Sequence, residues 1–342
     1  MATFRFTAGP WSILEGGDVE LFGGGISMSL DKKIGIFKDI GMDGVMFHDD
    51  DVVPDINNLT EQQIIDCAKD VKAELDKHGL FAEFVAPRLW LDPRTKNGGL
   101  TAISKEDLEF AKWRAHRTCD IAKVLGTNKI LLWLAREGTF CAESKSPVDM
   151  THQLVDSIND ILTYYPTSRV LIQPKHSGPV DRSICGTAGH VLAVGANTMD
   201  PSRVGLCLAS SAQAGLEPAH DMGFALAFNK LWSVHINDQN GITQDKAFGV
   251  ENLRSAFNQV KVLYENNFGD RGNFECVGLD VMPMSIQTYD DCYRHLVNSK
   301  KIFEMLLEKV KKFDYAFQAA CVKEQNFEKL EMYVMELLMG VA

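Results

Sequence analysis

The chain has 342 residues, which is enough for one large domain or two ordinary ones and excludes a disulfide-stabilised miniprotein. Its 45% hydrophobic and 24% charged residues, with only 27 Gly and 11 Pro, exclude a disordered or low-complexity chain. The formal net charge of -11 at pH 7 would repel a phosphate backbone, so we expect no nucleic-acid partner.

Short apolar runs alternate along the chain with longer segments of helical periodicity. The eight predicted strands cover residues 4–6, 44–47, 81–86, 129–133, 169–173, 204–208, 231–236 and 272–276. The predicted helices cover residues 30–40, 61–77, 106–125, 150–164, 186–196, 222–228, 251–264 and 289–311. This alternation predicts an α/β fold, a single closed (β/α)8 TIM barrel. The lack of a glycine-rich nucleotide loop after the first strand disfavours an open doubly wound sheet.

The barrel is predicted to occupy residues 1–311, and residues 312–342 are predicted to form a short C-terminal helical tail. The tail is rich in Phe, Met and Leu, so we expect it to pack on the barrel or at a subunit interface. No apolar run is long enough for a signal peptide or a membrane span, which predicts a cytoplasmic protein with no membrane partner. The eight scattered cysteines contain no Cys-x-x-Cys pair and indicate reduced thiols rather than a zinc site.

In such a barrel the functional residues lie after the carboxyl ends of the strands. The second predicted strand runs into His48, and a histidine beside Asp51 can be held in one tautomer for proton transfer. The alternative interpretation is a solvated acidic loop with a bystander histidine. Lys175, after the fifth strand, can polarise a carbonyl or hydroxyl oxygen, or it can be an ordinary surface lysine.

Three tryptophans lie at or after the ends of other predicted strands: Trp133 ends the fourth, and Trp11 and Trp90 follow the first and third. Flat aromatic faces suit the apolar C–H faces of a sugar ring, although any one of these side chains alone could serve only packing. No dense basic cluster for a phosphate group accompanies them, so the expected ligand is a small neutral sugar.

These residues resemble those of the xylose isomerase family, particularly its shorter, actinobacterial-type class, over about residues 4–310. The most specific match is the run Gly-Val-Met-Phe-His-Asp-Asp-Asp-Val-Val-Pro at 44–54. Further matches are Asn-Gly-Gly-Leu-Thr at 97–101, Trp133 with Arg-Glu-Gly at 136–138, Pro-Lys at 174–175 and Thr-Ala-Gly-His at 187–190.

The resemblance implies conversion of an aldose to its ketose by ring opening, a hydride shift and ring closure, with two divalent cations such as Mg²⁺, Mn²⁺ or Co²⁺. By resemblance, His48 with Asp51 would assist ring opening, and Lys175 would bind a substrate oxygen. The sugar would lie between Trp11, Trp90 and Trp133, with Phe22 reaching a neighbouring subunit's site.

The metal-binding half departs from the family pattern. By resemblance, ligand positions are substituted by residues without a carboxylate: Gln173, Ala209, Asn237 and Thr243. Asp245 and Glu275 would keep a carboxylate. Because hard divalent cations depend on carboxylate charge, the expected cofactor is none or one weakly bound Mg²⁺, Mn²⁺ or Co²⁺ ion.

Two functions therefore remain open. The first is a carbohydrate-binding protein degenerate for two-metal isomerisation, acting as a sugar-binding protein, a paralogue's partner or an assembly unit. The second is an active aldose–ketose isomerase or epimerase with a rebuilt single-metal site, with Asp238 as a substitute for Asn237. A metal-free ring opening by His48, Asp51 and Lys175 is a further alternative. The shortened tail indicates a homodimer, with a tetramer as the alternative.

Overall fold

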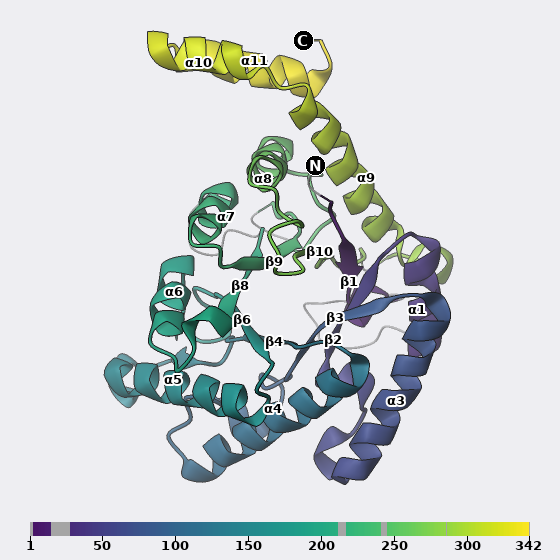
Figure 1. The fold of residues 1–342 in the computed structure, drawn as a ribbon, viewed down its shortest axis with the longest axis vertical. Helices are drawn as coiled ribbons and strands as arrows, with labels where there is room; N and C mark the ends of the chain where they lie inside the picture. Colours follow the sequence, from purple (N-terminus) through teal and green to yellow (C-terminus); the bar gives the residue numbers. More distant parts are fainter. Residues whose placement is uncertain (1–2, 15–27, 211–216, 241–244, 285, 342) are drawn as a thin grey trace.

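The computed structural model describes residues 3–14, 28–210, 217–240, 245–284 and 286–341. Eight parallel strands close into a barrel in the order β1-β10-β9-β8-β6-β4-β3-β2, with helices around it (Figure 1). This confirms the predicted (β/α)8 barrel. The barrel strands are β1 (Phe6–Ala8), β2 (Gly44–His48), β3 (Phe81–Ala86), β4 (Lys129–Trp133), β6 (Arg169–Gln173), β8 (Val204–Ala209), β9 (Leu231–Ile236) and β10 (Cys276–Leu279).

The helices begin and end where local sequence signals favour it. Thr60 caps the helix that follows it by accepting a hydrogen bond from the Gln63 amide, and Gly79 ends that helix in the left-handed conformation. The helices around the barrel are α1 (Leu30–Asp39), α3 (Glu61–His78), α4 (Lys105–Leu125), α5 (Pro147–Tyr164), α6 (Ala188–Ala196), α7 (Pro218–Ala227), α8 (Leu253–Glu265) and α9 (Arg294–Lys311). A short α2 (Asp49–Val52) follows β2, and β5 (Gly138–Thr139) pairs with β7 (Arg182–Ser183) outside the barrel.

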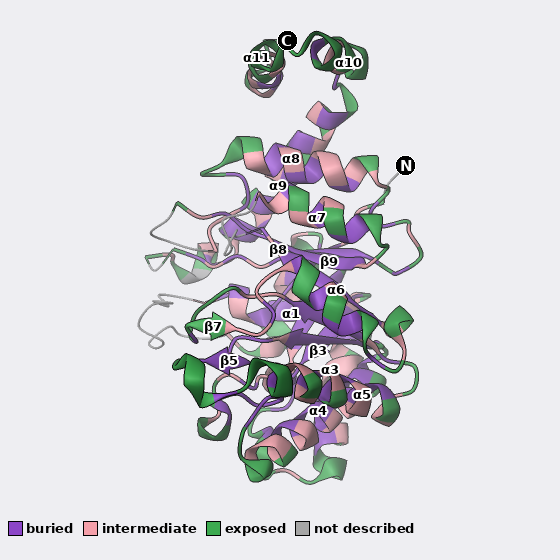
Figure 2. Ribbon diagram, turned by 90° about the vertical axis from the view of Figure 1, so that its left-hand side faces the viewer, coloured by how far each residue is buried: buried purple, intermediate pink, exposed green. Residues whose placement is uncertain are grey.

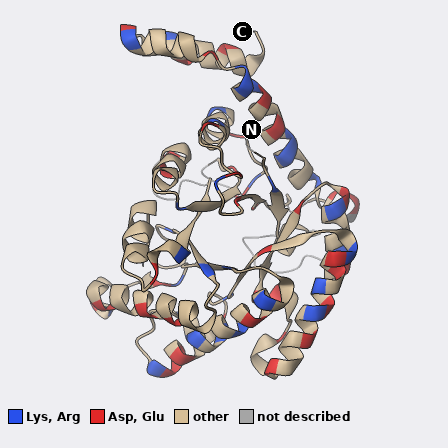
Figure 3. Ribbon diagram, in the orientation of Figure 1, with Lys and Arg blue, Asp and Glu red and all other residues tan. Residues whose placement is uncertain are grey.

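The barrel interior is a packed core. Met46, Phe84, Leu171 and Trp232 belong to one buried cluster inside it, so the barrel is closed to solvent at this level. Figure 2 shows the strands and the inner helix faces buried, with exposed residues on the outer faces. Figure 3 shows the charged residues mainly on the outer helices. Functional groups are therefore confined to the ends of the barrel.

The structure corrects the position of the last barrel strand. Residues 272–276 are predicted as strand, whereas β10 covers Cys276–Leu279. Gly272 and Phe274 have positive φ angles of 85° and 55°, which are incompatible with an extended strand. The shift of a few residues decides which carboxylate lies at the barrel mouth.

The C-terminal tail forms two helices, α10 (Tyr315–Glu324) and α11 (Phe327–Met339), which project beyond the barrel from the end of α9 (Figure 1). Phe317 and Tyr333 pack together with ring centroids 5.0 Å apart, and Arg254 of α8 forms an ion pair with Glu331 at 3.0 Å. Much of both helices is exposed (Figure 2). Within the part of the chain that the structure describes, no helix combines the length and hydropathy needed to cross a membrane.

A buried histidine ties α9 to the segment after β1. His295 Nε2 lies 2.8 Å from the Ser12 carbonyl oxygen, and burial lowers the His295 pKa to about 4. The unfolded chain therefore binds the proton more readily than the folded one. The resulting stability is complete above the unfolded pKa of 6.5 and is lost as the pH falls towards 4.

We predict that lowering the pH from 7 to 5 costs the protein about 2 kcal/mol of unfolding free energy through His295 alone. The measurement is urea unfolding of the wild type and His295→Gln across this range. The variant keeps a donor for the Ser12 carbonyl and should show a correspondingly smaller loss. Equal losses in the two proteins would contradict this assignment.

Candidate functional site

The carboxyl ends of the barrel strands bring together side chains that are up to 269 positions apart in sequence. Trp11, after β1, donates a hydrogen bond of 2.9 Å from Nε1 to Asp280 Oδ1, after β10. His48 at the end of β2 and Trp133 at the end of β4 lie at the same barrel end. We refer to this end as the barrel mouth.

Four aromatic rings form a continuous chain along one side of the mouth. The Trp11 and His48 ring centroids are 4.2 Å apart, and those of His48 and Trp90 are 5.1 Å apart. Trp90 meets Trp133 edge to face at 4.5 Å and 89°. Lys175 Nζ lies 5.1 Å from the Trp133 ring centroid. The structure thus brings together the three tryptophans, the histidine and the lysine that the sequence analysis selected.

The start of α2 fixes the position of Asp51 beside His48. Asp51 Oδ2 accepts a hydrogen bond of 2.9 Å from the His48 backbone N–H, as a residue at the third position of a helix can do. The same carboxylate oxygen lies 3.0 Å from His48 Nδ1. Burial opposes ionisation of Asp51, but the charge and hydrogen bond of His48 and the charge of Arg88 keep its pKa below the usual value. An ionised Asp51 can therefore orient the imidazole.

Arg88 is a site residue that the sequence analysis missed. Its guanidinium contacts His48 Nδ1 and donates to Asp51 Oδ1 at 3.0 Å. Its Nε atom lies 2.9 Å from Asp50 Oδ1. Arg88 is the second residue after β3, so its position after a predicted strand was the available signal. It places a permanent positive charge next to the histidine.

Asp49, the first residue of the three-aspartate run, has a structural role. It is fully buried, and its carboxylate accepts hydrogen bonds from Arg114 Nη2 at 2.8 Å and Thr118 Oγ1 at 3.2 Å. The Arg88 backbone N–H also donates to it, at 3.1 Å. Asp49 therefore joins the β2 end to α4 and to the segment after β3, and it supports the site without facing a ligand.

The other side of the mouth carries two carboxylates and two basic groups. His235 Nδ1 lies 3.5 Å from Asp280 Oδ2. Burial opposes a charge on His235, but Cys207 and Asp280 outweigh it and raise its pKa well above the usual value. Burial likewise disfavours a charged Asp280, but the His235 interaction and the Trp11 hydrogen bond keep the Asp280 pKa low. We assign an imidazolium–carboxylate pair here.

Asp245 lies next to this pair. Asn237 Nδ2 donates to Asp245 Oδ1 at 2.9 Å and to the Asp280 backbone carbonyl at 3.2 Å. Burial, and then the charge of Asp280, raise the pKa of Asp245 to about 7, although Lys175 and His235 act in the opposite direction. Burial also lowers the pKa of Lys175, and the charges of Asp245 and Asp280 partly offset this. Near neutral pH, Asp245 is poised between its two protonation states.

The structure gives a role to Glu137, the central residue of the Arg-Glu-Gly motif at 136–138. Its buried carboxylate accepts hydrogen bonds of 3.0 Å from the Gly99 and Leu100 backbone N–H groups. Thr101 donates to it from its backbone N–H at 2.9 Å and from Oγ1 at 2.5 Å. With four donors around it, Glu137 holds the segment between β3 and α4 beside the segment after β4.

Comparison with known proteins agrees with this geometry. A family model described as xylose isomerase-like TIM barrel matches residues 34–278. The chain belongs to this family.

A curated xylose isomerase from Thermus thermophilus is 28% identical over 286 residues, which cover 80% of this chain and 73% of that protein. A crystal structure of a D-tagatose 3-epimerase-like protein has a TM-score of 0.67 and 11% identity, covering 90% of this chain and 99% of that chain. The IOLI protein with a bound zinc atom has a TM-score of 0.61 and 14% identity, covering 90% and 99%. The two solved structures show the shared fold alone.

The structure corrects one expected metal ligand. Glu275 immediately precedes β10, at the amino end of the barrel, and its buried carboxylate accepts a hydrogen bond of 3.1 Å from Asn273 Nδ2. Asp280, not Glu275, follows β10 at the mouth. The error came from predicting the last strand over residues 272–276, whereas β10 covers Cys276–Leu279. The signal that could have found Asp280 is the apolar run of residues 276–279 immediately before it.

The described residues at the mouth, which exclude 211–216 and 241–244, do not fit the two divalent cations that the resemblance implies. Ala209, at the end of β8, has no donor atom, and Gln173, at the end of β6, has a neutral amide. Asn237 turns its amide N–H, not an oxygen, towards Asp245. Among the residues that the structure describes, no group of three or more His, Cys, Asp or Glu side chains is arranged to hold a metal ion. Phe22 and Thr243 lie outside the described residues.

The division of roles within the three-aspartate run is testable by paired substitutions. We predict that Asp49→Ala destabilises the protein by about 3–5 kcal/mol, because it leaves Arg114 buried without its counter-charge. Asp50→Ala should cost less than about 1 kcal/mol, since the Asp50 side chain is 30% exposed. Denaturant unfolding of both variants measures the difference, and equal losses would show that Asp49 has no special structural role.

The raised Asp245 pKa gives a second test. We predict that Lys175→Met raises the Asp245 pKa further, because it removes a nearby positive charge, whereas Lys175→Arg leaves it near 7. Asp280→Asn should lower it. The measurement is a pH titration of carboxyl ¹³C chemical shifts, with Asp245→Asn used to assign the signal. Unchanged titration in Lys175→Met would show that the ammonium group does not act on Asp245.

Proposed function

We propose that this protein binds a neutral sugar at the barrel mouth and does not carry out two-metal aldose–ketose isomerisation. The observation that carries the proposal is the continuous aromatic chain from Trp11 through His48 and Trp90 to Trp133, with Lys175 at its end. Aromatic faces pack on the C–H faces of a sugar, while Lys175 and His48 supply polar partners for its oxygens.

The charge arrangement supports the second half of the proposal. A two-metal site needs several carboxylates whose negative charge the cations balance. At this mouth Asp280 lies 3.5 Å from His235, whose pKa the nearby Cys207 and Asp280 raise, and Asp245 lies in the field of Lys175. The protein's own basic groups thus occupy the electrostatic role that divalent cations would otherwise take.

His48, Asp51 and Arg88 define what proton chemistry the mouth can perform. An imidazole oriented by an ionised carboxylate can exchange a proton with a sugar oxygen, which is the step needed to open a ring. Ring opening moves a proton from the anomeric hydroxyl to the ring oxygen and needs neither an oxidant nor a reductant. A metal-free mutarotation is compatible with sugar binding in this arrangement.

A second candidate is an isomerase or epimerase that uses one divalent cation. The raised pKa of Asp245, which results from burial and the nearby Asp280 carboxylate, favours it because a cation there would relieve the repulsion. The solved IOLI structure with a bound zinc atom is a fold relative. We also propose a homodimer and a role as the partner of an active paralogue. Both proposals are independent of whether the mouth binds a sugar.

We predict that D-xylose or D-glucose binds the wild type in isothermal titration calorimetry and that Trp133→Ala weakens this binding about tenfold, because it removes one aromatic wall. Trp113→Ala is the matched control, since Trp113 stacks on Phe110 of α4 and lies outside the aromatic chain. Added Mn²⁺ or Mg²⁺ should produce no ketose. Ketose formation that a chelator abolishes would favour the single-cation enzyme and reject the first proposal.

A further inference from the structure

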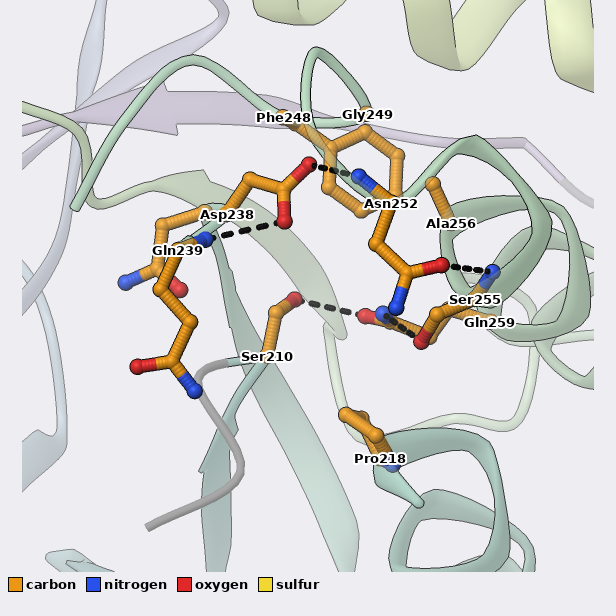
Figure 4. A pocket seen from close by; sticks show the side chains of 11 residues that line it. Ser210, Pro218, Asp238, Gln239, Phe248, Gly249, Asn252, Ser255, Ala256 and Gln259 are labelled. Carbon is orange, nitrogen blue, oxygen red and sulfur yellow. Dashed lines mark hydrogen bonds between the residues drawn. The ribbon is translucent and has the colours of Figure 1, made fainter. Parts of the chain in front are cut away.

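A cavity of about 210 Å³ lies at the carboxyl ends of β8 and β9, next to the aromatic chain's end of the barrel. It is bounded by residues after β8 and β9 on one side and by the first turns of α8 on the other (Figure 4). On a comparable measure, a cavity needs only about 10–15 Å³ to hold one water molecule. The cavity therefore has room for a small organic molecule.

Neutral amides and hydroxyls dominate the polar lining. Ser210 Oγ donates to Gln259 Oε1 at 2.6 Å, and Gln259 Nε2 lies 3.4 Å from Ser255 Oγ. Gln239 lies on the opposite side of the cavity from Gln259, and Asn252 lies beside Ser255 and Gln259 (Figure 4). Each amide offers both donors and an acceptor, and each hydroxyl can serve as either. Such a set matches a ligand that carries several hydroxyl groups.

The charged groups exclude an ionic ligand. Asp238 is the acidic residue of the lining, and its Oδ1 accepts a hydrogen bond of 2.9 Å from the Gln239 backbone N–H. Its Oδ2 accepts from the backbone N–H groups of Glu251 at 2.8 Å and Asn252 at 2.9 Å. With both oxygens engaged, Asp238 is a poor cation ligand. No Lys or Arg is found among the described residues around the cavity, so an anion has no counter-charge.

An apolar face in the lining also fits a carbohydrate-like ligand. The Phe248 ring lies on another side of the cavity (Figure 4) and supplies an apolar face for C–H groups.

We propose that this cavity is a second binding site, specific for a small neutral polyol or sugar. Its residues other than Asn237 are separate from the aromatic chain and from His48, Asp51 and Lys175. Asn237 links the two sites, because its amide nitrogen faces Asp245 at the mouth while the residue also lines the cavity. The inference does not depend on the function proposed for the mouth.

The test uses two probes, the four-carbon polyol erythritol and D-xylose, with binding followed by ligand-observed NMR. Erythritol should bind the wild type and Trp133→Ala alike, and Gln259→Leu should weaken its binding at least tenfold because it removes a central amide. Gln239→Ala, at a partly exposed position, is a second cavity variant that leaves the buried Gln259 hydrogen bonds intact. It should weaken erythritol binding in the same direction.

The outcomes separate the two proposals. If erythritol does not bind, or if Trp133→Ala abolishes its binding while both cavity variants retain it, the second site is rejected. D-xylose binding that Trp133→Ala weakens and Gln259→Leu leaves unchanged supports the mouth function whatever erythritol does. If the wild type does not bind D-xylose, the mouth function is rejected. The erythritol result then decides whether the cavity is a binding site.

Discussion

Closure of the barrel between β1 and β10 is the constraint on which the site depends. Phe6 pairs with Val277 and Ala8 with Leu279, so the first and last strands end at the same level. Only this pairing brings Trp11 next to Asp280, and through their hydrogen bond it connects the aromatic side of the mouth to the charged side. An open sheet with the same strands would leave these two residues at opposite edges.

On the charged side of the mouth, basic groups of the protein itself balance the negative charge of the carboxylates. Asp280 is matched by His235 and approached by the Trp11 N–H, while Asp245 is held between the repulsion of Asp280 and the attraction of Lys175. In a buried setting, charges of this kind are tolerated only when they are paired or when one of them takes up a proton. Gln173, Ala209 and Asn237 lie at or directly after the ends of neighbouring strands and add no negative charge there.

The match to the family model covers residues 34–278. This range contains strands β2 to β9, the run of residues 44–54 and the Glu137 network. Hydrogen bonds and ring packing position His48 and Trp133 within the barrel. A shared fold does not by itself decide which chemistry its mouth performs.

The sequence determined the barrel and most of one side of the mouth. Apolar periodicity fixes the strands, and in a parallel barrel the residues that follow the strands all lie at the same end. His48, Asp51, Trp133 and Lys175 could be selected on that basis alone. Tertiary structure decided what depends on contacts between distant segments. It separated the buried Asp49 from Asp51, placed Arg88 against His48, and exchanged Glu275 for Asp280. Strand boundaries near glycines are weakly encoded locally, and charge balance depends on distances that exist only after the barrel has closed.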